Sequence, residues 1–280
     1  MAEDRSWIPG PGTAVCGVIL HPAGHTRSPT MHNAAFRALG LDAVYLAFDV
    51  PPETLANAMA GVRALGLRQL AVSLPHKVAV IEHLDEIDAT ARAIGAVNTV
   101  TRQGNRLVGA NTDWLGAVRA LERETKLAGA RAVVLGAGGS ARAVVWGLRE
   151  RGAEVTVLNR SVDKAEALAV ELGARAAGPL QALADTPYDV LVNTTSVGLR
   201  SDASPVAAGA ITAGTTVLDA VYDPRDTRLL EDARKRGART VAGKWMLVHQ
   251  AAAQLELWSG AKAPIEVMAA AFDGQAESAG

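Results

Sequence analysis

The sequence predicts an α/β protein of two domains, each built around a mostly parallel sheet. Its 280 residues exceed the length of one typical domain. Continuous apolar runs alternate with helical patterns along most of the chain, which is typical of parallel strands covered by helices on both faces. The alternation restarts near residue 131 with a glycine-rich turn between a strand and a helix. These observations predict an α/β first domain followed by a doubly wound Rossmann-type domain.

The first half contains three apolar strand-like runs, at 14–20, 43–50 and 69–74, separated by helical patterns near 29–39 and 53–65. Two β-rich segments then flank Gln103-Gly104-Asn105. This spacing predicts a hairpin that brings an antiparallel strand into the sheet.

The second half begins with a strand, a glycine turn, a helix and a strand within about 30 residues. Further strands are expected at 188–196, 215–223 and 238–243. We place the domain boundary between Asp113 and Arg131, inside a helical stretch. The segments 246–260 and 264–274 have apolar residues at helical spacing, but periodicity does not decide which domain they join.

Composition excludes several classes of protein. The chain is 49% hydrophobic and 20% charged with a net charge of −1, so no basic excess favours nucleic acid as a partner. Cys16 is the single cysteine, lies in an apolar run and suits a reducing compartment. Residues 1–12 lack the apolar segment of a signal peptide, and no apolar run approaches the roughly 20 residues that span a bilayer. The expected location is the cytoplasm, away from membranes.

The segment from Gly136 to Ala141, GAGGSA, follows an apolar strand and opens a helix. Gly136 allows the tight turn, Gly138 lets the backbone approach a diphosphate, and Ala141 permits close helix packing. The N–H groups at this helix start would then bind the diphosphate. The context favours a dinucleotide cofactor over a merely tight connection.

The end of the next strand indicates which dinucleotide. An NAD site usually has an acidic residue there for the ribose 2′-hydroxyl, whereas this strand ends in Asn159-Arg160-Ser161. Arginine can pair with a 2′-phosphate and stack on adenine, so the sequence favours NADP. An ordinary solvent-exposed turn is the alternative, and Asp163 is the nearest acidic residue.

Polar residues also follow the first strand, at the carboxyl edge where α/β sheets bind ligands. Ser28 and Pro29 predict a helix start, with serine as the N-cap. Thr26 has no such structural role. His21, His25 and His32 could suggest a metal, but Pro22 and Gly24 interrupt any helical face and no acidic residue is near, so no metal site is expected.

Lys77 ends SLPHK, where a strand should give way to a helix. It is either a solvated helix-start residue or a placed proton donor. The chain also resembles the shikimate dehydrogenase family over about residues 14–273, through nine motifs in order. They are GHTRSPTMHNAAF, VSLPHK, GAVNTV, GANTD, GAGGSARA, NRS, NTTSVGL, DAVYDP and MLVHQAA.

The resemblance implies NADPH-dependent, reversible reduction of 3-dehydroshikimate to shikimate, on the way to chorismate and the aromatic amino acids. It implies a substrate-binding domain over 1–113, completed by helices in 247–280, and an NADP-binding Rossmann domain over 114–246. It leaves monomer or homodimer open. The catalytic lysine of the family matches Lys77 and its partner aspartate matches Asp113, so the resemblance makes Lys77 a placed proton donor.

The resemblance also implies binding residues. Those for the substrate match Thr26, Ser28, Ser73, Lys77, Asn98, Asp113, Tyr222 and Gln250. Those for the cofactor match Gly136, Ala137, Gly138, Gly139, Ser140, Asn159, Arg160, Ser161, Lys164, Ala220, Gly243 and Met246. Taken singly, Asn98 could satisfy strand backbone, Gln250 could be an exposed helix residue, and Tyr222 could be a core aromatic.

The chain departs from the family at four positions. Thr26 replaces a usual serine, Ala71 and Ser73 replace asparagine and threonine, and Trp245 is bulkier than the common small residue. A site built to hydrogen-bond one hydroxyl discriminates strongly by its loss. Quinate or an amino analogue of shikimate is therefore an alternative substrate, with altered cofactor preference. A non-catalytic dinucleotide sensor is the alternative outside enzymes, and intact Lys77 and Asp113 disfavour it.

Overall fold

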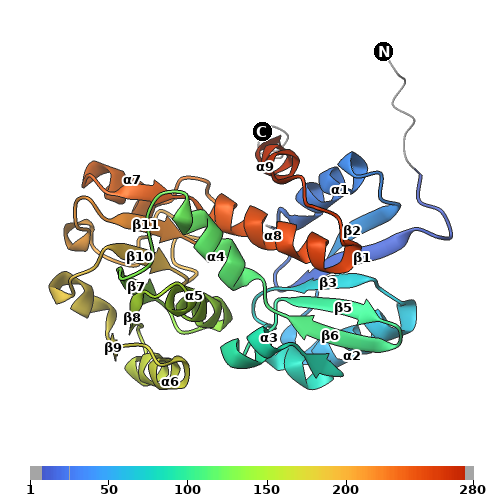
Figure 1. The fold of residues 1–280 in the computed structure, drawn as a ribbon, viewed down its shortest axis with the longest axis horizontal. Coiled ribbons are helices and arrows are strands. Elements are labelled where there is room, and N and C mark those ends of the chain that lie inside the picture. The colour runs from blue at the N-terminus through green and yellow to red at the C-terminus, as the bar shows by residue number, and fades with distance from the viewer. Residues whose placement is uncertain (1–7, 25, 275–280) are drawn as a thin grey trace, which may run out of the picture.

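The computed structural model describes residues 8–24 and 26–274. In this described part, two six-stranded sheets stand side by side, the first formed by the N-terminal half of the chain and the second by the following half (Figure 1). The strand orders are β2-β1-β3-β5-β6-β4 and β12-β11-β10-β7-β8-β9. The predicted α/β class with two sheets is confirmed.

The first sheet is mixed. Parallel β1 lies between β2 and β3, and β5 pairs antiparallel with both β3 and β6. The hairpin expected at 103–105 is therefore confirmed, while the short β4, parallel to β6, was not anticipated. The strands are β1 (Ala14–Leu20), β2 (Ala43–Asp49), β3 (Gln69–Val72), β4 (Glu86–Ile87), β5 (Thr99–Gln103) and β6 (Arg106–Ala110).

The helices of the first half are α1 (Ser28–Ala38), η1 (Pro52–Thr54), α2 (Leu55–Leu65), η2 (Ala79–His83) and α3 (Ala89–Ile94). Of these, α1 and the pair η1 and α2 fall close to the ranges expected near 29–39 and 53–65, whereas η2 and α3 were not predicted. The prediction that Ser28 caps α1 is wrong, because Arg27 is the N-cap residue, its side chain makes no capping hydrogen bond, and Ser28 is already the first helical residue.

All strand pairs of the second sheet are parallel, in the doubly wound order of a Rossmann fold. Its strands are β7 (Arg131–Leu135), β8 (Glu154–Leu158), β9 (Ala176–Gly178), β10 (Val190–Asn193), β11 (Thr216–Asp219) and β12 (Arg239–Val241). Its helices are α4 (Asp113–Glu122), α5 (Gly139–Glu150), α6 (Val162–Leu172), η3 (Leu180–Asp185), η4 (Ala208–Ala210) and α7 (Arg228–Lys235). The short β9 was missed by the sequence.

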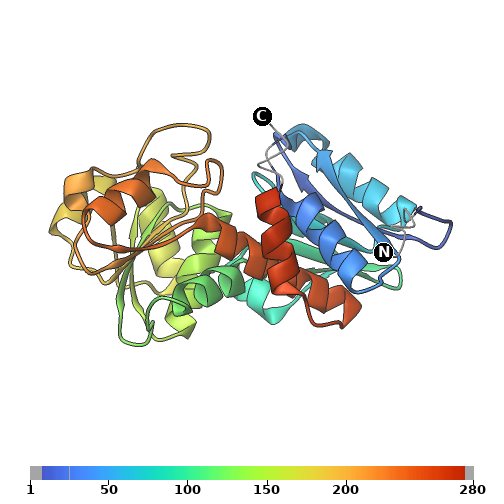
Figure 2. The same cartoon turned by 90° about the horizontal axis from the view of Figure 1, so that it is seen from above.

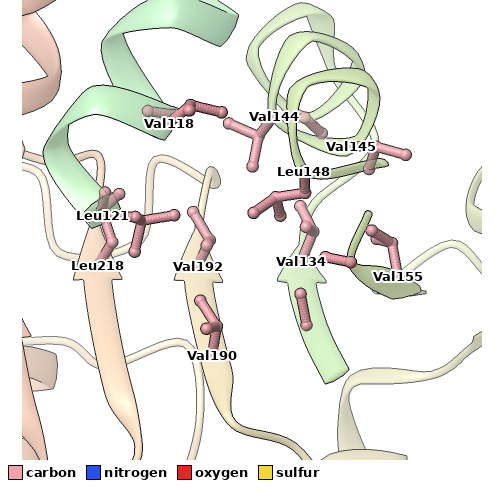
Figure 3. Packing of buried hydrophobic residues seen from close by; sticks show 14 of the residues in the cluster. Val118, Leu121, Val134, Val144, Val145, Leu148, Val155, Val190, Val192 and Leu218 are labelled. Carbon is pink, nitrogen blue, oxygen red and sulfur yellow. The ribbon is translucent and has the colours of Figure 1, made fainter. Parts of the chain in front are cut away.

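One buried cluster of this half lies between its sheet and the helices α4 and α5, and another packs η3 and α7 on the opposite face. Val134, Val192 and Leu218 point from neighbouring strands towards Leu121 of α4 and Leu148 of α5 (Figure 3). Continuous apolar runs make such strands hydrophobic on both faces, so helices must cover both.

The last helices, α8 (Gly243–Ser259) and α9 (Ile265–Gly274), return to the first half. Val248 and Ala252 of α8 and Phe272 of α9 share one buried cluster with residues of β1 and α1. Seen from above, α8 and α4 lie between the two sheets (Figure 2). The chain position 246–247, expected as a boundary, falls inside α8.

A glycine lets α4 and α8 approach closely. A Cβ added to Gly116 would lie 2.5 Å from the Met246 carbonyl oxygen and 2.9 Å from the Gln250 Cβ. Backbone atoms cannot retreat from such a contact without moving the helix, so the interhelical distance depends on this glycine.

We therefore expect Gly116→Ala to lower the free energy of unfolding by about 1–3 kcal/mol, because overpacking outweighs the gain in helix propensity. Gly61, inside α2, is the matched control, since an added Cβ would meet nothing within 4 Å. Gly61→Ala should raise stability by up to about 1 kcal/mol. Denaturant unfolding of both variants is the measurement, and equal effects would contradict the packing argument.

Candidate active site

A cleft of about 480 Å³ lies between the two halves. It forms where the carboxyl ends of β1, β3 and β6 and the start of β5 face the carboxyl ends of β7, β10 and β11. Its lining includes all eight residues expected to bind substrate, which are Thr26, Ser28, Ser73, Lys77, Asn98, Asp113, Tyr222 and Gln250.

Lys77 and Asp113 form an ion pair inside this cleft. The Lys77 Nζ lies 2.6 Å from Asp113 Oδ2, and the two side chains are only 14% and 6% exposed. Lys77 sits in the turn after β3, where its carbonyl oxygen accepts from the Val97 N–H. Asp113 is the first residue of α4, and its N–H donates to Asn111 Oδ1. Backbone contacts on both sides therefore hold the pair in place.

Asn98 joins this pair to α8. Its Nδ2 donates to Asp113 Oδ1 at 2.8 Å and lies 3.2 Å from Gln250 Oε1. Its Oδ1 accepts from the Thr112 backbone N–H, so it also satisfies backbone. Gln250 is buried rather than exposed, with its Nε2 donating to the Leu247 carbonyl.

The lysine also meets the second half of the molecule. Lys77 Nζ donates to Ser140 Oγ at 3.0 Å, and a Cβ on Gly139 would lie 3.0 Å from the Lys77 Cβ. The ammonium group therefore stands at the point where the glycine turn after β7 meets the turn after β3.

Hydroxyl groups occupy the far side of the cleft. Thr26 Oγ1 accepts from the Ser28 N–H at 3.3 Å, and the Thr26 side chain hydrogen-bonds to Tyr222. Burial raises the pKa of Tyr222 to about 12, an effect that the Thr26 hydrogen bond opposes. Tyr222 is therefore a neutral hydroxyl at physiological pH. Ser73 and Ala71 line the same cleft.

The start of α5 fits a diphosphate. Gly136 has a φ of +111°, and a Cβ there would lie 2.7 Å from Thr194 Oγ1, so the turn needs glycine. Gly138 is the N-cap residue and no side chain caps the helix. Gly138, Gly139 and Ser140 line the cleft, whereas Gly136 and Ala137 do not. Uncapped N–H groups at a helix start are the chemistry that a phosphate requires.

The residues expected at the adenosine end lie at the edge of β8, outside the lining of the cleft. Arg160, Ser161 and Lys164 are exposed, and Asn159 Nδ2 donates to the Ser161 carbonyl at 3.0 Å. No acid stands at the strand tip, since Asp163 already belongs to the first turn of α6.

Ala220, Gly243 and Met246 also line the cleft. Gly243 approaches β11 closely, because an added Cβ would meet three carbonyl oxygens within 2.8 Å. Trp245, a departure from the family pattern, faces a different cavity, where the Arg123 guanidinium stacks on its ring at 3.8 Å. It therefore does not shape the cleft.

The histidines of the first half have structural partners. The His21 ring is hydrogen-bonded to Asp49, and buried His32 stacks on Tyr45 with ring centroids 4.1 Å apart. His25 lies outside the described residues. Within the described ranges, no group of three or more acidic, histidine or cysteine residues could hold a metal. Over the same ranges, no helix is both long and apolar enough to cross a membrane.

Sequence reasoning missed several residues of the cleft. The NTTSVGL motif, residues 193–199, contributes four lining residues that the sequence did not mark as site residues: Thr194, Thr195, Ser196 and Leu199. Gln254 follows Gln250 by one helical turn, and its Nε2 donates to the Asn98 carbonyl and to Thr99 Oγ1. The spacing of four residues was the available signal.

The Rossmann sheet facing a second α/β half across a polar cleft defines a dinucleotide-dependent oxidoreductase. The chain belongs to the shikimate dehydrogenase family. It matches the shikimate dehydrogenase substrate binding domain over residues 18–100, shikimate / quinate 5-dehydrogenase over 119–199 and the shikimate 5′-dehydrogenase C-terminal domain over 243–271.

Individual relatives agree with this assignment. Shikimate dehydrogenase (NADP(+)) of Symbiobacterium thermophilum is 46% identical, and the alignment covers 98% of this chain and 100% of that protein. A shikimate dehydrogenase solved with NADP+ superimposes with a TM-score of 0.91 at 38% identity, over 96% of this chain and 97% of that one. The Thermus thermophilus enzyme, solved with NADP(H) and shikimate, gives 0.88 at 40% identity, over 94% and 99%.

One buried carboxyl supports the cofactor side of the cleft without lining it. Asp219, at the end of β11, accepts hydrogen bonds from Asn193 Nδ2, the Val221 N–H and the Thr227 hydroxyl, at 2.9, 3.0 and 2.7 Å. Burial raises its pKa from 3.8 to about 6, although these hydrogen bonds oppose the rise. The carboxyl fixes the loop that carries Ala220 and Tyr222.

This raised pKa makes stability depend on pH. Between about pH 4 and pH 6 the folded protein keeps a proton that the unfolded chain releases, so stability falls as the pH rises through this window. Asp219→Asn removes the effect, and its stability relative to wild type should improve by roughly 3 kcal/mol between pH 4 and 7. Urea unfolding at several pH values tests this, and parallel curves for the two proteins would refute it.

Proposed function

We propose that this protein is an NADP-dependent shikimate dehydrogenase that reversibly reduces 3-dehydroshikimate to shikimate. The observation that carries the proposal is the buried Lys77–Asp113 pair, which stands beside the uncapped start of α5. Family membership and the relative at 46% identity support it. The product would serve the route to chorismate and the aromatic amino acids.

The chain's own contribution to the reaction is proton transfer. The bound cofactor supplies the hydride. Lys77 donates a proton to the carbonyl oxygen of the substrate as negative charge develops there, and in the reverse direction it accepts the hydroxyl proton. Asp113, 2.6 Å away, orients the ammonium group and balances its charge. Because both side chains are largely shielded from water, their electrostatic effect on the reacting oxygen is stronger than in solution.

The substrate would be held by groups at both ends of the cleft. Thr26 and Ser28 are proposed for its carboxylate, with Ser28 at the start of α1, where partial positive charge favours an anion. Ser73, Asn98, Tyr222 and Gln250 would serve its carboxylate and ring hydroxyls. Their placement around one cleft supports this assignment.

The cofactor would lie along the carboxyl edge of the second sheet. Gly136 to Ser140 are proposed for its diphosphate, with Asn159, Arg160, Ser161 and Lys164 for the phosphorylated ribose. Ala220, Gly243 and Met246 are proposed for the nicotinamide. An exposed arginine at a strand tip without an acid supports NADP over NAD.

We also propose the domain division 1–113 with 247–280 for substrate and 114–246 for NADP. The two separate sheets and the packing of α8 and α9 on α1 support it. Buried Cys16, the single cysteine of the chain, supports work in the reducing cytoplasm.

A second candidate is a quinate or aminoshikimate dehydrogenase. The observation that favours it is the position of Thr26, Ala71 and Ser73, three departures from the family pattern that line the cleft. A changed methyl or a lost amide in this wall alters which ring substituent fits.

Initial rates of oxidation separate these candidates. We expect fast turnover with shikimate and NADP+, and slow turnover with quinate or with NAD+. A preference for quinate or an amino analogue would move the assignment to the second candidate. Binding of NADP+ without turnover of any of these substrates would overturn both.

Lys77→Ala should lower kcat about 10²–10⁴-fold while shikimate still binds, because general acid–base catalysis is lost. Lys235→Ala is a matched control, since Lys235 pairs with Glu231 at 3.7 Å on the surface. Shikimate binding by calorimetry and turnover should be measured on both variants. Retained turnover in Lys77→Ala would remove the lysine from the mechanism.

Arg160→Ala should weaken NADPH binding at least about tenfold and NADH binding much less, because NADH lacks the 2′-phosphate that pairs with the guanidinium and can lose only the stacking on adenine. Arg175→Ala is the control, because Arg175 forms an exposed ion pair with Glu154. Fluorescence titration with both cofactors measures the effect. Equal weakening for NADPH and NADH would argue against a 2′-phosphate contact.

A further inference from the structure

The loop after β10 contains an unusual backbone conformation. Arg200 has a φ of +50° and is the one residue other than glycine with positive φ in the part of the chain that the structure describes. This conformation is unfavourable for a side chain with a Cβ, so compensating contacts must hold it.

Arg200 has contacts on both sides of the cleft. Its N–H donates to the Asp223 carbonyl at 2.8 Å, and its Nε donates to Asp223 Oδ2 at 3.1 Å. The same guanidinium reaches the other half, where Nη2 donates to the Gly24 carbonyl at 3.1 Å. Asp223 and Arg200 belong to loops of the second sheet, whereas Gly24 follows β1 of the first. The Asp223 carboxylate thus orients the fork of Arg200 towards the opposite half.

The residues on either side of these contacts line the cleft. Gly24 precedes Thr26 by two residues, and Asp223 directly follows Tyr222. Tyr222 is itself hydrogen-bonded to Thr26. Leu199, next to Arg200, lines the cleft as well. The loops after β1, β10 and β11 therefore meet at the hydroxyl end of the cleft, where the substrate carboxylate is proposed to bind.

We propose that Arg200 is a positioning residue that holds the loop after β1 against the second half and thereby keeps Thr26 in its binding position. The inference rests on the proposed function, because it concerns the affinity for the substrate of that same cleft. Arg200 does not line the cleft, so its effect passes through Gly24 and Thr26.

The size of the effect follows from exposure. The Arg200 side chain is 56% exposed, so water and salt weaken its contacts, and the free energy that they contribute is small. A substrate that binds only the joined arrangement loses affinity in proportion to the fraction of molecules in which the loops have separated. Loss of Arg200 should therefore raise the KM for shikimate about three- to tenfold. NADP+ binding and kcat should change less than about twofold.

Arg200→Gly is the decisive variant, because glycine adopts the positive φ without strain and the loop keeps its backbone conformation. Arg200→Lys retains the charge but loses the fork that contacts Asp223 and Gly24 together, so its KM should be intermediate. Arg131→Ala is the control, since Arg131 pairs with Asp189 at similar exposure and away from the cleft. Its KM should equal that of wild type.

The measurements are the KM for shikimate at saturating NADP+, kcat, the Kd of NADP+ without substrate, and the melting temperature. A raised KM in Arg200→Gly, with the other three values unchanged, supports the proposal. The ratio of the variant KM to the wild-type KM should also be smaller in 0.5 M salt than at low salt. An unchanged KM in an active enzyme overturns it, and so does an equal loss of NADP+ affinity. Absence of shikimate oxidation in wild type would instead refute the proposed function.

Discussion

The close contact between α4 and α8 determines how the rest of the molecule is arranged. Gly116 lets the two helix backbones meet, and this contact places the start of α4 beside the middle of α8. Asp113 lies one turn before Gly116, and Gln250 lies opposite it, so both side chains reach the same cleft. Asn98, just before β5 of the first sheet, donates from its side-chain amide to Asp113 and lies within hydrogen-bonding distance of Gln250. Close backbone packing at a residue without a side chain thus assembles the polar site.

The polar site is costly to bury, and its hydrogen bonds show how the cost is met. The side-chain oxygen of Asn98 accepts from the Thr112 N–H, and its side-chain nitrogen donates to Asp113. Gln254 donates to the backbone carbonyl of Asn98. A buried amide or carboxylate without such partners would destabilise the fold. Asp219 shows the limit of this compensation, because three donors surround its carboxylate and burial still raises its pKa to about 6. Side chains satisfied in this way are fixed in direction, which a catalytic cleft requires.

Local signals predicted local structure well. The turn from Gly136 to Ala141 was readable because tight turn, helix start and strand lie within six residues. The N-cap rule failed at Ser28 because Arg27 takes that place and Ser28 lies in the cleft. Lys77 was ambiguous from its neighbours, since its partners Asp113 and Ser140 are 36 and 63 residues away and only the ordered motifs indicated a placed lysine. β4 and β9 escaped notice because a pairing of two or three residues leaves no periodic pattern, and Gln254 had only its four-residue spacing from Gln250 as a signal.

The two halves are joined by contacts of different strength. On one side, α4 and α8 meet through backbone atoms and buried side chains, which allow little relative movement. At the opposite end of the cleft, the loops meet through Tyr222 with Thr26 and Arg200 with Gly24, and the arginine is half exposed. Hydrogen bonds to water can replace the second kind of contact at small cost, but nothing replaces the first. Any separation of the halves should therefore begin at the loops and pivot about the helices. Lys77 and Asp113 lie near the contact between α4 and α8, so the geometry of this ion pair would be kept while the substrate enters at the end of the cleft formed by the loops.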